Sequence, residues 1–214
     1  SDTMEQFKQL TSRLMPIPAE NVDTDQIIPV CFLKVTDKDG LGKVAFCDWR
    51  YSDTVATLED ADTATPNPDF VLNDERYAGA RIILAGDNFG AGSSREHASW
   101  ALMGAGIVSV ISTSFADIFR NNALKNGLLP VVVSPQAHHR LFEMVEADPG
   151  TEVTIDVENT QLLLTDGTSE EFPIDAFSRK CLLQGVDQLG YLMSFVDKVE
   201  EFEKNHVVYG APVK

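Results

Sequence analysis

Apolar runs and helical patterns alternate regularly in the middle of the chain, and this alternation leaves few possible folds. Each apolar run is short and rich in β-branched residues, which is typical of a buried strand, and the segments between them have apolar residues at helical spacing. Strands that alternate with helices in this way form a parallel sheet, because a parallel connection needs a crossover. We expect strands at 80–85, 106–111 and 128–133 and helices at 94–103, 115–125 and 135–147.

The segments on either side of this unit predict further elements around the same sheet. The 214 residues are enough for one large domain, so we expect residues 1–214 to form a single domain of the α/β class. Residues 52–69 are rich in Asp, Thr, Ala and Pro without apolar periodicity, which predicts a mobile insertion. The other expected elements are a first strand at 7–17, short strands at 151–157, 161–165 and 170–174, and C-terminal helices at 175–183 and 189–204.

The charge of the chain excludes several classes of partner. The chain has 17 Lys and Arg residues against 33 Asp and Glu residues, a formal net charge of -16 at pH 7. A field of this sign repels phosphate backbones and anionic lipid headgroups, so we expect neither nucleic acid nor a membrane as partner. An anionic substrate therefore needs a local group of positive charges and backbone N–H donors.

The cysteines indicate a reducing compartment. Cys31, Cys47 and Cys181 are odd in number and far apart, which argues against a disulfide framework. Because no Cys-x-x-Cys pair is present, the sequence predicts no metal or iron–sulfur site made by this chain alone. The chain has no signal segment at its start and no apolar stretch near the roughly 18 residues of a membrane span. We therefore expect a cytoplasmic protein.

The segment best suited to chemistry lies between the strand expected at 80–85 and the helix after it. From Gly86 to His97 it reads Gly-Asp-Asn-Phe-Gly-Ala-Gly-Ser-Ser-Arg-Glu-His. Glycines let the backbone approach a ligand, the two hydroxyls donate and accept hydrogen bonds, and Arg95 presents a planar fork that suits a carboxylate. The helix N-terminus adds N–H donors and partial positive charge. The sequence therefore predicts a carboxylate-binding site here.

A purely structural interpretation of the same residues is also open. Ser93 and Glu96 have the spacing of a capping box, with Ser93 as the N-cap of the helix. Other ligand motifs do not fit, because a P-loop needs Lys where Ser93 stands and the dinucleotide fingerprint needs Gly where Arg95 stands. A Gly-x-Ser-x-Gly nucleophile elbow is also missing, which disfavours a free-standing serine hydrolase.

Several motifs in the same order resemble one enzyme family. Residues 90–102, Gly-Ala-Gly-Ser-Ser-Arg-Glu-His-Ala-Ser-Trp-Ala-Leu, resemble the small subunit of 3-isopropylmalate dehydratase, of the aconitase superfamily. The resemblance extends over about residues 7–190, with one departure at Ala91, where family members often have Cys. The supporting motifs are Asn-Val-Asp-Thr-Asp-Gln-Ile-Ile-Pro at 21–29, Asp-Trp-Arg at 48–50, Pro-Asn-Pro-Asp-Phe-Val-Leu-Asn at 66–73, Ser-Phe-Ala-Asp-Ile-Phe at 114–119, Leu-Leu-Pro at 128–130 and Ile-Asp-Ala-Phe at 174–177.

The resemblance implies a fold, a reaction and a partner. The fold is an aconitase-type swivelling domain, a three-layer β/β/α arrangement with a central, partly parallel sheet. The reaction is the dehydration of 2-isopropylmalate and rehydration to 3-isopropylmalate, a step of leucine biosynthesis. In relatives a [4Fe-4S] cluster held by the large subunit is the Lewis acid. The resemblance thus implies a large-subunit partner, a small dicarboxylate substrate and no cofactor bound by this chain.

The resemblance also assigns roles to individual residues. Ser93 aligns with the serine whose deprotonated oxygen is the catalytic base, and Ser94 and Arg95 align with substrate-binding residues. The loop after Pro29 is expected to select the substrate. The further expected substrate contacts are Leu33, Lys34, Val35 and Arg50, and the residues expected to support the site are Gly90, Gly92, Glu96 and His97.

Simpler interpretations of several polar residues stay open. The loop at 32–36 also fits a solvated loop, and Arg50 also fits a surface arginine that covers Trp49 or pairs with an acidic neighbour. Asp23 and Asp25 lie in a turn sequence, where aspartates usually bond their own backbone. His97 is expected to stabilise its helix or to orient Ser94.

Two other functions are compatible with the sequence. One is the small subunit of a homoaconitase-like or citraconate-type hydro-lyase, which would differ in the loop at 32–36. The other is a non-catalytic carboxylate-binding or assembly module, which gains weight if Ser93 is only a helix cap.

Overall fold

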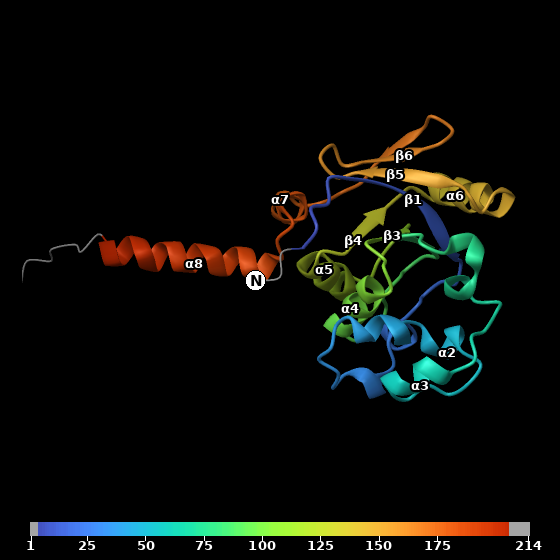
Figure 1. The fold of residues 1–214 in the computed structure, drawn as a ribbon. Helices are drawn as coiled ribbons and strands as arrows, with labels where there is room; N and C mark the ends of the chain where they lie inside the picture. The colour runs from blue at the N-terminus through green and yellow to red at the C-terminus, as the bar shows by residue number, and fades with distance from the viewer. Residues whose placement is uncertain (1–3, 206–214) are drawn as a thin grey trace, which may run out of the picture.

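A single mixed sheet organises the protein. The structure, a computed structural model, describes residues 4–205. Within them seven strands pair in the order β4-β3-β2-β1-β5-β6-β7 (Figure 1). The strands are β1 Gln9–Ile17, β2 Ile82–Ala85, β3 Ser109–Ser112, β4 Leu129–Val132, β5 Glu152–Asp156, β6 Gln161–Leu164 and β7 Ser169–Glu171.

Strand β1 divides the sheet into two halves. On one side it runs parallel to β2, and β3 and β4 continue in parallel. On the other side it pairs antiparallel with β5, and β6 and β7 continue the antiparallel half. Every residue of β2 and β3 is buried, as in other covered parallel strands, whereas buried residues alternate with more exposed ones along β5. The expected α/β class with a partly parallel sheet is confirmed.

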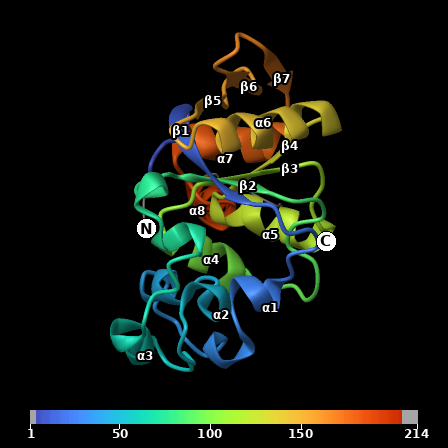
Figure 2. The ribbon, with the colours of Figure 1, turned by 90° about the vertical axis from the view of Figure 1, so that its right-hand side faces the viewer.

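The two views show the layers. The antiparallel strands β5, β6 and β7 lie at the top, β3 and β4 lie below them, and the helices α4 and α5 lie beneath (Figures 1 and 2). The two β layers are the antiparallel and the parallel half of the one seven-stranded sheet, and α4 and α5 form the helical layer beneath, as expected for a β/β/α arrangement. The helices are α1 Thr24–Ile27, α2 Cys47–Arg50, α3 Leu58–Thr63, α4 Glu96–Gly104, α5 Asp117–Asn126, α6 Pro135–Ala147, α7 Ala176–Gln184 and α8 Gln188–Asn205, with 3-10 turns η1 Val30–Phe32, η2 Gly40–Val44, η3 Val71–Asn73 and η4 Glu75–Tyr77.

Local signals explain where most of the helices begin and end. Helix α6 has the predicted bounds, because Pro135 opens it and the Ser134 hydroxyl accepts the Ala137 N–H at 3.2 Å. Helix α5 ends at Gly127, whose φ of 87° is the left-handed conformation of a helix C-cap. Helices α4 and α5 each begin two residues later than predicted, at Glu96 rather than Ser94 and at Asp117 rather than Phe115, and neither has a side-chain cap.

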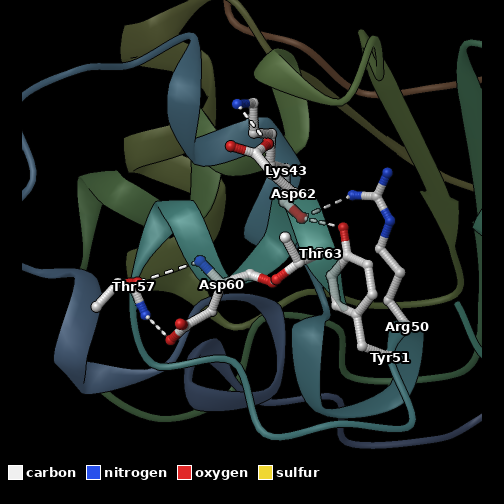
Figure 3. Close-up of polar contacts among 7 residues, drawn as sticks. All are labelled: Lys43, Arg50, Tyr51, Thr57, Asp60, Asp62 and Thr63. Carbon is white, nitrogen blue, oxygen red and sulfur yellow. Dashed lines mark hydrogen bonds and ion pairs between the residues drawn. The ribbon is translucent and has the colours of Figure 1, made fainter. Parts of the chain in front are cut away.

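The segment expected to be a mobile insertion contains a short helix. Helix α3 lies inside 52–69, and Thr57 and Asp60 form a capping box at its start (Figure 3). Lys43 pairs with Asp62 at 2.8 Å, which joins the segment to the η2 turn. The helix was not predicted, because the segment lacks an apolar face and depends on its cap instead. Its mobility remains a prediction.

Helix α8 extends away from the rest of the described chain (Figure 1). None of its residues is buried. The two expected C-terminal helices are thus present, as α7 and α8, within a residue of their predicted ends. Among residues 4–205, no helix combines the length and the apolarity that crossing a bilayer requires.

Candidate active site

The candidate site lies where the parallel strands end. β1, β2 and β3 run in the same direction, so the loops that follow them meet at one edge of the sheet. The loop after β2 lies in the middle, with a bridge from Ala91 to Asp23 on one side and a bridge from Phe89 to Phe115 on the other. The predicted loop is therefore anchored on both sides.

Backbone hydrogen bonds hold this loop in place. The N–H of Gly90 donates to the carbonyl of Val22 at 2.7 Å, and the N–H of Thr24 donates to the carbonyl of Ala91 at 2.8 Å. On the other side, the N–H of Phe89 donates to the carbonyl of Ser114 at 3.2 Å. A loop whose backbone groups are hydrogen-bonded on both sides keeps its side chains at fixed positions.

Asp87 joins the ends of β2 and β3. Its carboxylate accepts the hydroxyls of Ser114 at 2.6 Å and Thr113 at 2.7 Å. These hydrogen bonds hold the pKa of Asp87 below its usual range, because they favour the charged form. Asp87 is thus an ionised structural residue of the loop.

Gly90 and Gly92 have backbone conformations that favour glycine. Both have a positive φ, 84° at Gly90 and 96° at Gly92. A Cβ at Gly90 would lie 2.2 Å from the Cγ of Phe119, whereas at Gly92 the nearest atom would be the Thr24 hydroxyl at 3.4 Å. The loop therefore requires glycine at residue 90 for two separate reasons.

Ser93 lies in the loop before the helix and does not cap it. The N-cap of α4 is Arg95, and no side-chain hydrogen bond caps this helix. The capping-box interpretation of Ser93 and Glu96 is therefore wrong. The Ser93 carbonyl accepts the Thr24 hydroxyl at 3.0 Å. Ser93 is exposed, and within residues 4–205 its own hydroxyl has no hydrogen-bond partner.

Ser94 faces helix α5. Its hydroxyl accepts the side-chain N–H of Asn122 at 2.7 Å. The Asn122 carbonyl in turn accepts the Asn126 side chain at 2.8 Å, and Asn126 accepts the indole N–H of Trp100 at 3.0 Å. Asn122 was not predicted, because its link to Ser94 spans 28 residues.

Arg95 forms an ion pair with Asp25. The contact joins Arg95 Nη1 to Asp25 Oδ1, and the Arg95 side chain is 13% exposed against 58% for Asp25. Asp23, by contrast, caps α1 by accepting the Gln26 N–H at 2.8 Å, as its turn sequence indicates. The prediction that these aspartates bond their own backbone is therefore right for Asp23. It is wrong for Asp25, which pairs with Arg95 instead.

His97 connects α4 to the loop expected to select the substrate. Its Nε2 donates to the Val35 carbonyl at 3.1 Å, and its ring lies 4.7 Å from that of Trp100. His97 thus reaches Val35, and the expected role in orienting Ser94 finds no contact in residues 4–205. Of the three expected loop residues, Leu33 and Val35 are half-buried and Lys34 is exposed, while Glu96 is exposed at the first position of α4.

Arg50 contacts the η2 turn. Its Nη1 donates to the carbonyls of Gly42 at 2.8 Å and Lys43 at 3.2 Å, and the Tyr51 hydroxyl donates to the same Lys43 carbonyl at 2.7 Å (Figure 3). Within residues 4–205, no hydrogen bond or ion pair joins Arg50 to the loop that carries Ser93. Its buried Nε has no hydrogen-bond partner there.

The cysteines of this chain do not fit an iron–sulfur cluster. Within residues 4–205, no three His, Cys, Asp or Glu side chains are grouped closely enough to hold a metal ion. Burial raises the pKa of Cys47 to about 12 and also raises the pKa of Cys31 and of Cys181. Cluster ligation needs thiolates, which these environments disfavour.

Comparison with known proteins agrees with this geometry. The fold and its strand-end loop define an aconitase-type swivelling domain, and the family model described as "Aconitase C-terminal domain" matches residues 4–136. A second model, described as LeuD_N, matches residues 139–176. The chain belongs to the family of 3-isopropylmalate dehydratase small subunits, which confirms the resemblance found in the sequence.

Individual relatives cover nearly the whole chain. The 3-isopropylmalate dehydratase small subunit of Anaeromyxobacter dehalogenans (strain 2CP-C) is 54% identical over 200 residues, which are 94% of this chain and 98% of that protein. The small subunit of Roseiflexus castenholzii is 51% identical and covers 92% of both chains. The crystal structure of 3-isopropylmalate dehydratase (leuD) from Methanocaldococcus jannaschii has a TM-score of 0.62 at 29% identity, covering 92% of this chain and 99% of that one.

Proposed function

We propose that this chain supplies half of the active site of a hydro-lyase that isomerises 2-isopropylmalate to 3-isopropylmalate in leucine biosynthesis. The observation that carries the proposal is the loop at 86–95, which lies at the strand ends of this family's fold and contains an exposed Ser93 and an Arg95 paired with Asp25. An arginine and free N–H groups at this edge are what a dicarboxylate needs in a protein of net charge -16.

Arg95 binds one substrate carboxylate. Asp25 engages its Nη1 and so fixes the direction of the guanidinium. Nη2 and Nε have no partner within residues 4–205, which leaves two parallel donors for a carboxylate. Ser94, whose hydroxyl is held by Asn122, precedes Arg95 in the chain and supplies a further hydrogen bond to the substrate.

Ser93 takes the carbon-bound proton. Its deprotonated oxygen removes a proton from the carbon next to a carboxylate, and the electron pair of that bond forms the double bond of the enoic diacid as the hydroxyl leaves. Rehydration returns the proton from Ser93. A serine alkoxide needs nearby positive charge, which Arg95 and the N-terminus of α4 supply.

We propose that a partner subunit binds the hydroxyl group that leaves the substrate. The relatives are named small subunits, which implies a large subunit. Since the cysteines of this chain do not fit a cluster, we assign the [4Fe-4S] cluster expected for this reaction to the large subunit. Leu33, Lys34 and Val35 are then the contacts for the substrate side chain, and the half-buried Leu33 and Val35 suit an isopropyl group. We place the assembly in the cytoplasm, in keeping with the free cysteines.

Reconstitution tests the function. Hydration of the enoic diacid and dehydration of isopropylmalate are measured with this chain alone, with the cluster-loaded large subunit alone and with both together. We expect turnover only in the mixture. Turnover by either chain alone would refute a shared active site, and a mixture with an intact cluster that prefers a longer or more acidic diacid would favour the homoaconitase-like alternative.

A further inference from the structure

Helix α8 carries an apolar stripe made of Leu189, Leu192, Val196 and Val199. These residues follow one another at intervals of three and four, which places them on one face of the helix. Their exposed fractions are 71%, 53%, 49% and 53%. A contiguous exposed apolar surface of this kind marks an interaction site, because packing of the apolar face is what chiefly stabilises a helix in water. We therefore expect another surface to pack against this stripe.

The first turn of α8 attaches the helix to the body of the protein. The Tyr191 ring lies 5.5 Å from that of Phe177, and the Lys180 Nζ lies 5.4 Å from the centre of the Tyr191 ring. The side chain of Gln188 donates to the Ser178 hydroxyl at 2.8 Å. Tyr191 lies off the stripe, and Gln188 uses only the first position of the helix, so α7 holds α8 while the stripe from Leu189 to Val199 stays exposed.

The stripe leads toward the candidate active site. Leu189 and Leu192 line a cavity of about 810 Å³ together with Trp100 and Met103 of α4. Glu96, the first residue of α4, lines the same cavity and directly follows Arg95 in the chain. The stripe and this cavity, here called the docking surface, are therefore continuous and end beside the loop that carries Ser93.

The charges on α8 indicate which partner fits. Glu200 and Glu203 continue the stripe at the same helical spacing beyond Val196 and Val199, and both are exposed. A second copy of the chain would bring the same acids and a net charge of -16, which repulsion opposes. The complementary surface is an apolar groove with Lys or Arg where it meets the end of α8.

We propose that this docking surface binds the large subunit of the enzyme, and that the large subunit contributes such a groove. The inference rests on the proposed function, because a shared active site requires the large subunit to face the loop at 86–95. Of the candidate occupants, only this partner must reach the end of the docking surface that adjoins Arg95.

The test measures the Kd between the full chain and its cluster-loaded large subunit. We expect the double variant Leu192→Gln/Val196→Gln to raise the Kd at least about 10-fold, because apolar side chains at the centre of an interface carry much of the affinity. Ser194→Gln, an exposed change on the opposite face of α8, is the matched control and should leave the Kd within about twofold. Glu200→Gln/Glu203→Gln should weaken binding at low salt and lose its effect near roughly 0.5 M salt. Circular dichroism verifies that α8 persists in each variant.

The possible outcomes test the docking surface and the proposed reaction independently. An unchanged Kd for Leu192→Gln/Val196→Gln would overturn the docking surface, even if the mixture turns over isopropylmalate. A dimer of this chain alone that the double variant dissociates would also overturn it, by assigning the stripe to a second copy. Binding that depends on the stripe, in a mixture with an intact cluster and no isopropylmalate turnover, would support the docking surface and refute the proposed reaction.

Discussion

At the scale of single residues, the candidate site depends on contacts between residues far apart in sequence. The ion pair of Arg95 with Asp25 spans 70 positions and the hydrogen bond of Ser94 with Asn122 spans 28. The loop residues themselves were predictable, because glycines, hydroxyls and an arginine stood together after a strand. Asp25 and Asn122 were not, because each lies in a local sequence that has an ordinary structural explanation.

Arg95→Lys should lower kcat/KM of the reconstituted enzyme by about 100-fold. A lysine is a point charge and cannot keep its contact with Asp25 while it presents two parallel donors to a carboxylate. Steady-state kinetics checks this, with Arg81→Lys as the control, since Arg81 pairs with the exposed Glu5. Equal effects of the two substitutions would contradict the assigned role of Arg95.

Gly90→Ala should destabilise the protein by about 3 kcal/mol, because a positive φ and a clash with Phe119 act together. Gly106 separates the two effects. Its φ is 90°, but nothing lies within 4 Å of an added Cβ, so Gly106→Ala should cost only about 1 kcal/mol. Urea unfolding measures both. If Gly90→Ala and Gly106→Ala lower the free energy of unfolding by similar amounts, Phe119 moves aside and packing does not require glycine at residue 90.

At the scale of elements, helix boundaries were predictable where local signals and tertiary contacts agree. For α6 the Ser134 and Pro135 signals coincide with the observed start. For α4 the Ser93 and Glu96 spacing gave a false start, because contacts to Thr24, Asn122 and Asp25 hold residues 93–95 outside the helix. Tertiary contacts thus override a local capping pattern in the loop that we propose as part of the active site.

The bond network of Asp87, which ties the end of β2 to β3, should make stability depend on pH. Its pKa is lowered in the folded protein by Ser114 and Thr113. The stabilisation by the charged Asp87 carboxylate is therefore complete above the ordinary aspartate pKa of about 4. It is lost as the pH falls through the lower pKa that Asp87 has in the folded protein. We expect the difference in free energy of unfolding between wild type and Asp87→Asn to be constant above about pH 5 and to shrink in more acidic solution. A difference independent of pH would contradict this role.

At the scale of the whole molecule, the sheet could be predicted from the sequence better than the positions of the peripheral helices α3 and α8. The alternation of strands and helices over 80–147 fixes the parallel half, because a crossover leaves few arrangements. The outward extension of α8 and the small helix α3 were not predictable, since the first depends on a covering surface outside the chain and the second on a cap. The proposed active-site loop and the docking surface adjoin each other, as we expect of one half of a larger assembly.

Turnover of isopropylmalate by the large subunit reconstituted with Ser93→Ala decides whether this chain provides the catalytic base. Ser194→Ala is the matched control, because Ser194 is an exposed serine on α8. We expect turnover to fall by roughly 10³-fold with Ser93→Ala, because proton transfer loses its base, and to stay unchanged in the control, with the same Kd for the large subunit in both. Turnover near the wild-type rate with Ser93→Ala would contradict the claim that this chain provides the catalytic base.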